Sequence, residues 1–212
     1  RVAVQFGATP SSVDAFVYRD DEQVHEFTQL IRDENSSLPL VLLGHSYGSF
    51  ITQKLIKAYS ADYDAVVISG SAHLTPTGLN PRPLNAKWNK DAGATGFEWL
   101  SRDPKVGAAF SKDPLTFYAD PIKLFGLRNA LKLYHTPKPT IRPDLPLLIL
   151  VGADDPVGGL KSNKALADAY VRAGLDNVTL ISYDDARHEV FNETNSDEVS
   201  ADTLEWLKLQ LG

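Results

Sequence analysis

A turn at residues 44–48 constrains the fold of this chain more than any other stretch. It reads Gly-His-Ser-Tyr-Gly, with Ser46 at its centre, and follows an apolar run at 39–43 that predicts a short buried strand. Residues 49–59 then have the pattern of a helix. A G-x-S-x-G pattern between a strand and a helix indicates a sharp, strained turn that lifts the serine hydroxyl clear of a sheet, and the two glycines let strand and helix approach. We therefore predict that Ser46 is a nucleophile and that the backbone N–H of Tyr47 helps to form an oxyanion hole.

An α/β sheet is predicted around this turn. Two apolar runs, at 64–70 and 145–152, lack the alternation of half-exposed strands, as expected for strands buried on both faces of a parallel sheet. Sequence patterns further indicate strands at 1–6, 13–18 and 177–183 and helices at 20–33, 160–173 and 197–211. Strands that alternate with helices favour a mostly parallel sheet, flanked by helices and joined by right-handed crossovers.

The alternation stops between residues 71 and 143, a stretch rich in proline and aromatic residues. Helices are predicted there at 96–102, 104–111 and 121–135. A long stretch without strands between two buried strands predicts an inserted cap, and such excursions are usually functional. The expected domains are therefore a core, formed by 1–70 and 144–212, and a helical cap formed by 71–143.

Composition excludes several function classes. The 212 residues carry a net charge of −6 without a cluster of lysine or arginine, so nucleic acid is not an expected partner. No apolar run reaches the length of a transmembrane segment, although the apolar face of 121–135 could contact a membrane surface transiently. The chain has no cysteine, no H-E-x-x-H spacing and no glycine-rich nucleotide loop, so neither a metal nor another cofactor is expected. The oligomeric state is left open.

The start of the chain bears on its location in the cell. No secretory leader is visible, which favours a cytoplasmic location. The chain begins with Arg1 and contains no methionine, however, so we expect a natural N-terminal stretch to lie outside this sequence. That stretch would hold further strands of the sheet.

Two later loops hold candidate partners for the serine. A serine hydroxyl needs a base within hydrogen-bond reach and a third group that orients the base. His188 follows the predicted strand at 177–183. Asp154 and Asp155 follow the predicted strand at 145–152. Because sites in open α/β sheets gather at the carboxyl ends of strands, we predict His188 as the base and one of these aspartates as the orienting acid.

Four motifs together resemble one branch of a known superfamily. They are GHSYGSF at 44–50, WLSRD at 99–103, GADDPVGG at 152–159, and ARHE at 186–189 with Asn192 and Glu193 beyond it. From about Val24 to its end, the chain is similar to the monoacylglycerol lipase/lysophospholipase-like branch of the α/β-hydrolase superfamily. The resemblance implies that Ser46, Asp155 and His188 form a catalytic triad that needs no cofactor. It implies small lipophilic esters, with one fatty acyl or other lipophilic group, as substrates.

One part of the family pattern has no match in this chain. The family carries a His-Gly motif after an early strand, and the backbone of that motif helps to form the oxyanion hole. Gly7 follows a predicted strand, but the sequence around it, Phe-Gly-Ala, is a poor match. A second oxyanion donor is therefore not identified, and loss of one such donor costs about 100- to 1000-fold in rate.

Five residues are candidates to line the substrate site. They are His45, His73, Trp99, Phe125 and Val157. Packing remains the alternative: the His45 side chain is expected to point away from the site, and a structural role is the simpler interpretation of His73. Most aromatic residues of the cap are likewise expected to pack against the sheet, with a few lining the pocket.

The predicted function is hydrolysis of a lipophilic carboxylic ester through an acyl-enzyme. The same triad could instead cleave an amide or peptide bond, or transfer the acyl group. A non-catalytic binding protein with this fold is a further alternative. The missing oxyanion motif favours it, and the intact order of Ser46, Asp155 and His188 disfavours it.

Overall fold

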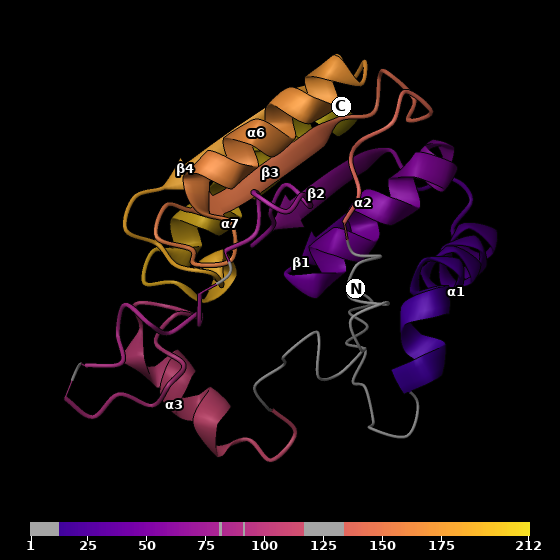
Figure 1. The fold of residues 1–212 in the computed structure, drawn as a ribbon. Helices are drawn as coiled ribbons and strands as arrows, with labels where there is room; N and C mark the ends of the chain where they lie inside the picture. The colour runs from indigo at the N-terminus through magenta and orange to yellow at the C-terminus, as the bar shows by residue number, and fades with distance from the viewer. Residues whose placement is uncertain (1–12, 81, 91, 117–133) are drawn as a thin grey trace.

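The computed structural model describes residues 13–80, 82–90, 92–116 and 134–212. Among these residues, a four-stranded parallel sheet in the order β1-β2-β3-β4 forms the centre of the fold (Figure 1). The strands are β1 (Val41–His45), β2 (Ala65–Ser69), β3 (Leu147–Gly152) and β4 (Val178–Tyr183). His45 pairs with Ser69, and Gly152 pairs with Tyr183, so neighbouring strands end side by side. The loops that follow the strands therefore gather at one end of the sheet.

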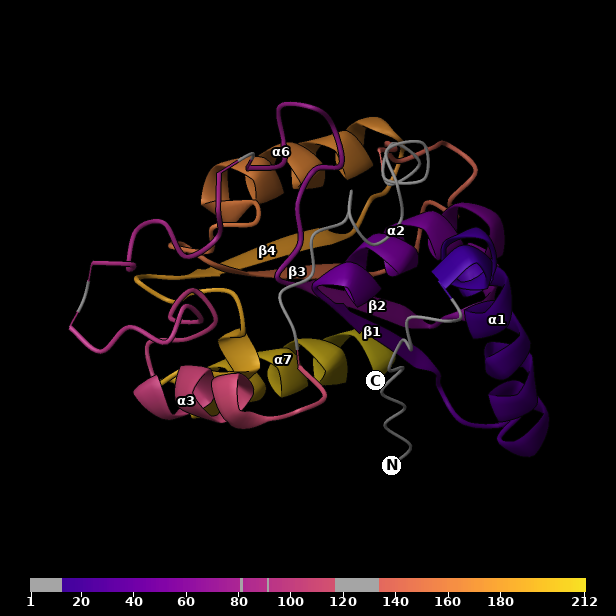
Figure 2. The same cartoon turned by 60° about the horizontal axis from the view of Figure 1, so that its bottom comes forward.

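Helices cover both faces of this sheet (Figure 2). They are α1 (Val13–Glu34), α2 (Tyr47–Tyr59), α3 (Pro104–Lys112), α6 (Gly159–Arg172) and α7 (Ser196–Leu211), with short 3-10 turns η2 (Ser60–Asp62) and η4 (Val190–Asn192). α2 and α6 pack on one face and α7 packs on the other, while α1 packs on the outer side of α2. In the described part of the chain, no helix is both long and apolar enough to cross a membrane.

The core lies on both sides of the central strands. All five side chains of β2 are buried, and successive side chains point to opposite faces. Ile68 belongs to a cluster with Leu55 of α2 and Tyr170 of α6. Val67 belongs to a second cluster with Trp206 of α7. Burial of each large aliphatic side chain contributes about 1.5–3 kcal/mol, which explains why these strands are apolar without alternation.

Most of the predicted elements are confirmed. The strands expected at 64–70, 145–152 and 177–183 and the helices expected at 49–59, 104–111, 160–173 and 197–211 all lie within two residues of the observed bounds. The mostly parallel sheet flanked by helices is confirmed as well. The strand expected at 1–6 and most of the helix expected at 121–135 lie outside the described residues.

The strand predicted at 13–18 is wrong, because these residues lie in α1. The acidic residues 20–22, which were expected to form a first helical turn, lie inside the same helix. No glycine or proline occurs between residues 13 and 34, so no helix breaker interrupts this segment. An alternation over five residues is too short to separate a strand from a helix.

The helix predicted at 96–102 is also wrong, because this segment forms turns. Gly96 has a φ of 90°, outside the range of a right-handed helix. The Glu98 carboxylate accepts hydrogen bonds from the backbone N–H groups of Thr95 and Gly96. Such local side-chain bonds offer the backbone an alternative to helical hydrogen bonds.

β1 is less buried than predicted. It lies two residues later than the expected strand at 39–43 and pairs, among the described strands, with β2 alone. Leu43 of β1 is 50% exposed. A strand at the edge of a sheet has fewer neighbours to cover its side chains, which accounts for this exposure.

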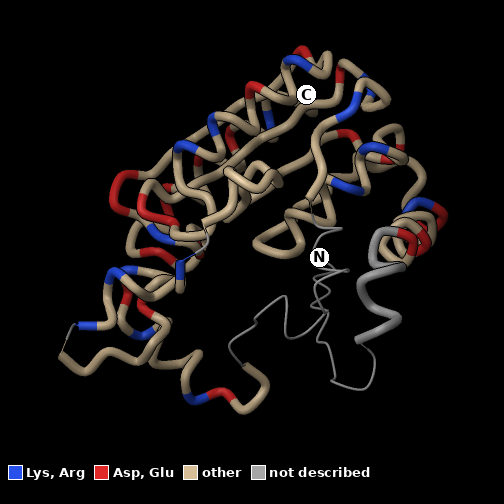
Figure 3. The backbone as a smooth tube through the Cα atoms, in the orientation of Figure 1, with Lys and Arg blue, Asp and Glu red and all other residues tan. Residues whose placement is uncertain are grey.

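Charged residues of both signs are spread along the described part of the chain (Figure 3). Figure 3 shows lysine and arginine interspersed with aspartate and glutamate in the described part of the chain. Mixed charge of this kind is what the net charge of −6 and the absence of a basic cluster predict.

Candidate active site

Ser46 stands at a strained turn between β1 and α2. Its φ and ψ are 54° and −122°, a backbone conformation that residues with side chains rarely adopt. Its backbone N–H donates to the carbonyl oxygen of Ser69, at the end of β2, at 2.9 Å. A Cβ atom on Gly44 would overlap Thr52 and lie 2.6 Å from the carbonyl oxygen of Gly48. A Cβ atom on Gly48 would meet nothing within 4 Å, so the steric need for glycine holds for Gly44 alone.

Two contacts of hydrogen-bond length join Ser46, His188 and Asp155 in a line. The Nε2 atom of His188 lies 2.8 Å from the Oγ atom of Ser46, and its Nδ1 atom lies 3.0 Å from Oδ1 of Asp155. His188 and Asp155 are 2% and 5% exposed. Oδ1 of Asp155 also accepts the backbone N–H of Val157 at 2.9 Å, which helps to orient the carboxylate. A base can activate a neighbouring hydroxyl as a nucleophile when a carboxylate orients that base.

The loop that carries His188 passes over the ends of β3 and β2 and so brings His188 to Ser46. β1 and β4 are three strand spacings apart, or about 14 Å. A Cβ atom on Gly152, at the end of β3, would overlap the carbonyl oxygens of the two residues that precede His188. A Cβ atom on Gly70, after β2, would lie 2.9 Å from the Cε1 atoms of both His188 and His45. Sequence reasoning missed this role of the two glycines, although each stands at the end of a buried apolar run.

Two aromatic rings flank the imidazole of His188. The rings of Trp99 and His45 each have their centroid 4.9 Å from that of His188. The prediction that His45 points away from the site is therefore wrong, because its ring lies beside His188 with Nδ1 3.2 Å from the Ser69 hydroxyl. Burial, and then the neighbouring His188, lower the pKa of His45 to about 4 against the opposing charge of Asp155. The His45 ring is thus neutral at pH 7.

The two adjacent aspartates have different partners. Asp155 faces His188, whereas Oδ2 of Asp154 forms an ion pair with Nζ of Lys87 at 2.6 Å. The Asp154 side chain is 39% exposed, and a surface ion pair of this kind contributes little to stability. The geometry therefore agrees with the choice of Asp155 over Asp154 as the partner of the histidine.

The remaining candidate residues lie in different surroundings. Val157 touches Asp155 through its backbone, and Tyr47 is the first residue of α2, directly after the serine. His73 donates its backbone N–H to the Ser162 hydroxyl of α6 at 2.9 Å, and burial lowers the pKa of its ring. No hydrogen bond in the described structure joins His73 to the serine, histidine or aspartate above. Phe125 lies outside the described residues.

The arrangement defines the class of protein. A serine at a sharp turn after one strand, with an acid and a histidine in loops after two later parallel strands, is the plan of the α/β-hydrolase fold. In the stretches of chain that the structure describes, no three histidine, aspartate or glutamate side chains gather in a way that could hold a metal ion.

Comparison with known proteins gives the family. Residues 12–195 match the Hydrolase_4 family, described as serine aminopeptidase, S33, and the chain belongs to this family. Over 206 residues it is 29% identical to a monoacylglycerol lipase of Mycolicibacterium smegmatis. This match covers 88% of the chain and 69% of the relative.

Several solved structures resemble this chain in fold, at a lower sequence identity than the relative from Mycolicibacterium smegmatis. A thermostable carboxyl esterase from Bacillus coagulans has a TM-score of 0.75 and 19% identity, over 89% of this chain and 70% of that protein. A monoacylglycerol lipase from Paleococcus ferrophilus has a TM-score of 0.66 and 20% identity, over 92% of this chain and 76% of that protein. These two likenesses establish the α/β-hydrolase fold. The family and the relative from Mycolicibacterium smegmatis identify a serine ester hydrolase.

Proposed function

We propose that this enzyme hydrolyses carboxylic esters of lipophilic acyl groups, such as monoacylglycerols, through an acyl-enzyme on Ser46. The observation that carries the proposal is the pair of contacts that runs from Ser46 through His188 to Asp155. The relative from Mycolicibacterium smegmatis, named as a monoacylglycerol lipase, supports the substrate class.

In the proposed mechanism, Nε2 of His188 takes the hydroxyl proton as Oγ of Ser46 bonds to the ester carbonyl carbon. The Asp155 carboxylate holds the Nδ1–H group and stabilises the imidazolium that forms. His188 then gives the proton to the oxygen of the leaving alcohol as the carbon–oxygen bond breaks. Water repeats the two steps on the acyl-enzyme and releases the carboxylic acid.

We propose the backbone N–H of Tyr47 as one donor to the oxyanion of the tetrahedral intermediate. Its position at the start of α2, directly after Ser46, supports this role, because helix N-termini favour negative charge. A second donor is not assigned among the described residues.

We further propose that residues 71–143 form a cap that binds the lipophilic part of the substrate. This stretch contacts both loops of the proposed triad. The Trp99 carbonyl accepts the backbone N–H of His188, and Lys87 pairs with Asp154. Trp99, whose ring lies against His188, is the proposed apolar wall of the site, and His45 is a second proposed lining residue.

The nucleophile is tested by intact-mass measurement before and after treatment with a fluorophosphonate probe. We expect a single adduct on the wild type and no adduct on Ser46→Ala. An unmodified wild type with an intact fold would reject the proposed triad.

The bond that is cleaved is tested with two panels of substrates. The family is described as an aminopeptidase, whereas the relatives are lipases and esterases, so amide cleavage is the second candidate function. We expect p-nitrophenyl esters of increasing acyl length to be hydrolysed and aminoacyl p-nitroanilides to remain intact. Faster cleavage of the anilides would favour a peptidase.

A cytoplasmic location and transient contact with a membrane surface belong to the same proposal. Fractionation of the host cell tests the first. Co-sedimentation with phosphatidylcholine vesicles in the absence of substrate tests the second, and recovery of all protein in the supernatant would argue against it.

A further inference from the structure

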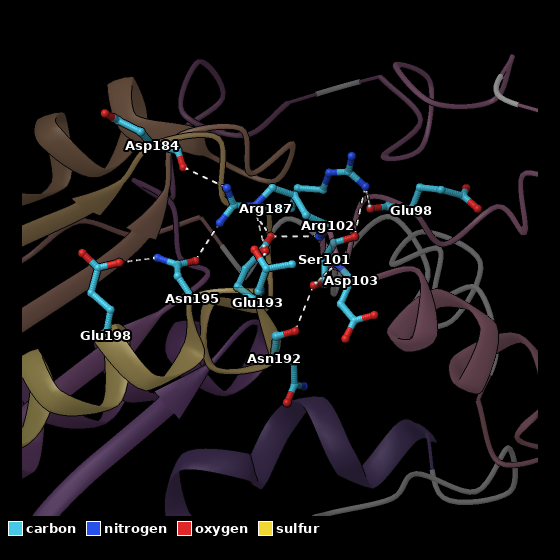
Figure 4. Close-up of polar contacts among 11 residues, drawn as sticks. Glu98, Ser101, Arg102, Asp103, Asp184, Arg187, Asn192, Glu193, Asn195 and Glu198 are labelled. Atoms are coloured by element: carbon cyan, nitrogen blue, oxygen red, sulfur yellow. Dashed lines mark hydrogen bonds and ion pairs between the residues drawn. The ribbon is translucent and has the colours of Figure 1, made fainter.

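A buried carboxylate outside the proposed triad, that of Glu193, ties two distant segments together (Figure 4). Its side chain is fully buried, with 0% exposure. Oε1 accepts the backbone N–H groups of Arg102 at 3.0 Å and of Arg187 at 2.8 Å. Oε2 accepts Nε of Arg102 at 2.9 Å and the backbone N–H of Thr194 at 3.0 Å. Four donors, one of them charged, thus compensate the cost of burying this charge.

The hydrogen bonds keep this carboxylate ionised. Burial by itself raises the pKa of Glu193, but the donors of Arg187, Arg102 and Thr194 outweigh burial and leave the pKa below its usual value. Glu193 is therefore a fixed negative charge that holds its donors at neutral pH.

A second set of bonds links the same two segments. Nη1 of Arg187 donates to the carbonyl oxygens of Glu98 at 2.6 Å and of Ser101 at 3.0 Å. The Ser101 hydroxyl donates to the carbonyl oxygen of Asn192 at 2.9 Å. The Arg187 guanidinium also lies 4.5 Å from the ring centroid of Trp88. Figure 4 shows Ser101, Arg187 and Glu193 among the side chains that lie between segments 98–103 and 184–198.

Segment 184–198 carries His188, and segment 98–103 carries Trp99, one of the two rings that flank it. The backbone N–H of His188 donates to the carbonyl of Trp99 at 3.3 Å, and that of Glu189 donates to the carbonyl of Leu100 at 2.8 Å. The position of the His188 backbone therefore depends on segment 98–103. Glu193 adds a further link, because its Oε1 atom accepts the backbone N–H groups of both Arg187, the residue before His188, and Arg102 of the same segment.

We propose that Glu193 and Arg102 form a positioning clasp for His188. The pair holds the His188 loop against segment 98–103, so that Nε2 stays within reach of the Ser46 hydroxyl. Glu193 does not touch the reacting atoms and acts through the backbone of its neighbours. The inference rests on the proposed function, because it assigns the clasp a purpose in the same triad.

A second arginine–carboxylate pair, at the other end of the sheet, offers a control, although its Asp64 side chain is 42% exposed whereas that of Glu193 is buried. Nη2 of Arg32 lies 2.7 Å from Oδ2 of Asp64, and this oxygen also accepts the backbone N–H of Leu40 at 2.6 Å. Asp64 precedes the first residue of β2, whereas the site lies beyond the last. Loss of this pair should not move His188.

The test compares Glu193→Gln, Arg102→Met and Asp64→Asn with the wild type. We would measure kcat and KM for p-nitrophenyl butyrate, the rate of fluorophosphonate labelling, and thermal unfolding by circular dichroism. In Glu193→Gln, the side-chain NH2 group would face an N–H group that is also a donor, so part of the clasp would be lost and His188 would be held less accurately. We therefore expect kcat to fall about 10- to 100-fold, with KM changed less than about twofold. Arg102→Met keeps the backbone donors, so a smaller loss of kcat is expected. Asp64→Asn should keep the wild-type kcat per folded molecule.

A spectroscopic readout separates positioning from stability. The proton shared by His188 Nδ1 and Asp155 should give a low-field NMR resonance that Asp64→Asn retains. Glu193→Gln should shift or broaden it. If Glu193→Gln does not fold, Arg102→Met decides with the same readouts.

The outcomes distinguish the clasp from the triad. A wild type that is not labelled rejects the proposed function itself. A labelled wild type, with folded Glu193→Gln and Arg102→Met that keep its kcat and labelling rate, overturns the clasp alone. The clasp is also overturned if Asp64→Asn loses as much kcat as these variants at equal loss of stability.

Discussion

The Nε2 atom of His188 lies 2.8 Å from the Oγ atom of Ser46, although 142 positions separate the two residues in the chain. They follow β4 and β1, which lie at opposite edges of the described sheet. The loop after β4 therefore has to pass over the ends of β3 and β2, where Gly152 and Gly70 leave the space that it needs. The contact between His188 and Ser46 therefore depends on two glycines that take no part in the proposed reaction.

The two adjacent aspartates should differ sharply in their effect on the rate. Asp155→Asn keeps the size of the side chain but offers His188 an amide that can hold the wrong tautomer, so we expect kcat to fall about 10⁴-fold. Asp154→Asn removes an exposed partner of Lys87 and should stay within about twofold of the wild type. Both are measured by hydrolysis of p-nitrophenyl butyrate. Equal losses in the two variants would contradict the assignment of Asp155.

The space above Gly70 can be tested with a single methyl group. Gly70→Ala places a Cβ atom 2.9 Å from the rings of His188 and His45, so we expect kcat to fall at least about tenfold as His188 is displaced. Gly93→Ala is the matched control, because Gly93 also has a positive φ, of 78°, but a Cβ atom there meets nothing within 4 Å. The control shares the backbone strain and should keep its kcat. Loss of kcat in both variants would indicate strain rather than displacement of the histidine.

Two buried tyrosines should respond in opposite ways to loss of the hydroxyl group. The Tyr170 hydroxyl is buried without a hydrogen-bond partner, so Tyr170→Phe should raise the free energy of unfolding by about 1 kcal/mol. The Tyr63 hydroxyl lies 2.8 Å from that of Thr28, so Tyr63→Phe should lower it by a similar amount. Urea denaturation at pH 7 measures both. A destabilised Tyr170→Phe would show that the hydroxyl has a partner.

The neutral ring of His45 should make stability depend on pH. Its pKa is about 4 in the folded protein, against 6.5 for a histidine exposed to water, so between these values the unfolded chain binds a proton that the folded protein does not. The contribution of His45 to the free energy of unfolding is therefore fully present above pH 6.5. It is lost as the pH falls towards 4, by at most about 1.4 kcal/mol per pH unit.

This dependence is measured by urea denaturation of the wild type and His45→Asn at pH 7, 5.5 and 4.5. The variant lacks the titrating ring and should lose less stability over this range. Parallel losses in the two proteins would show that His45 is not the group responsible.

Local patterns identified most elements and the turn that carries Ser46, the proposed nucleophile. The runs at 64–70 and 145–152 predicted buried strands because a strand covered on both faces needs apolar side chains at every position. The turn around Ser46 was readable because a strand, a G-x-S-x-G pattern and a helix are contiguous in the chain. The pattern was ambiguous at 13–18, where a few alternating residues fit either a strand or a helix, and the helix is what the structure has.

Most elements, the class of the sheet, and the placement of Ser46, the two aspartates and His188 after successive strands could be predicted from the sequence, because they depend on local patterns of residues. The resemblance favoured Asp155 over Asp154, and the three-dimensional structure gives the contact between Asp155 and His188. That the His45 ring lies beside His188 was found only in the three-dimensional structure. The burial of Glu193 between segments 98–103 and 184–198 also became visible only there. Such contacts join residues far apart in the chain, and their geometry follows from how the strands and loops pack rather than from local periodicity.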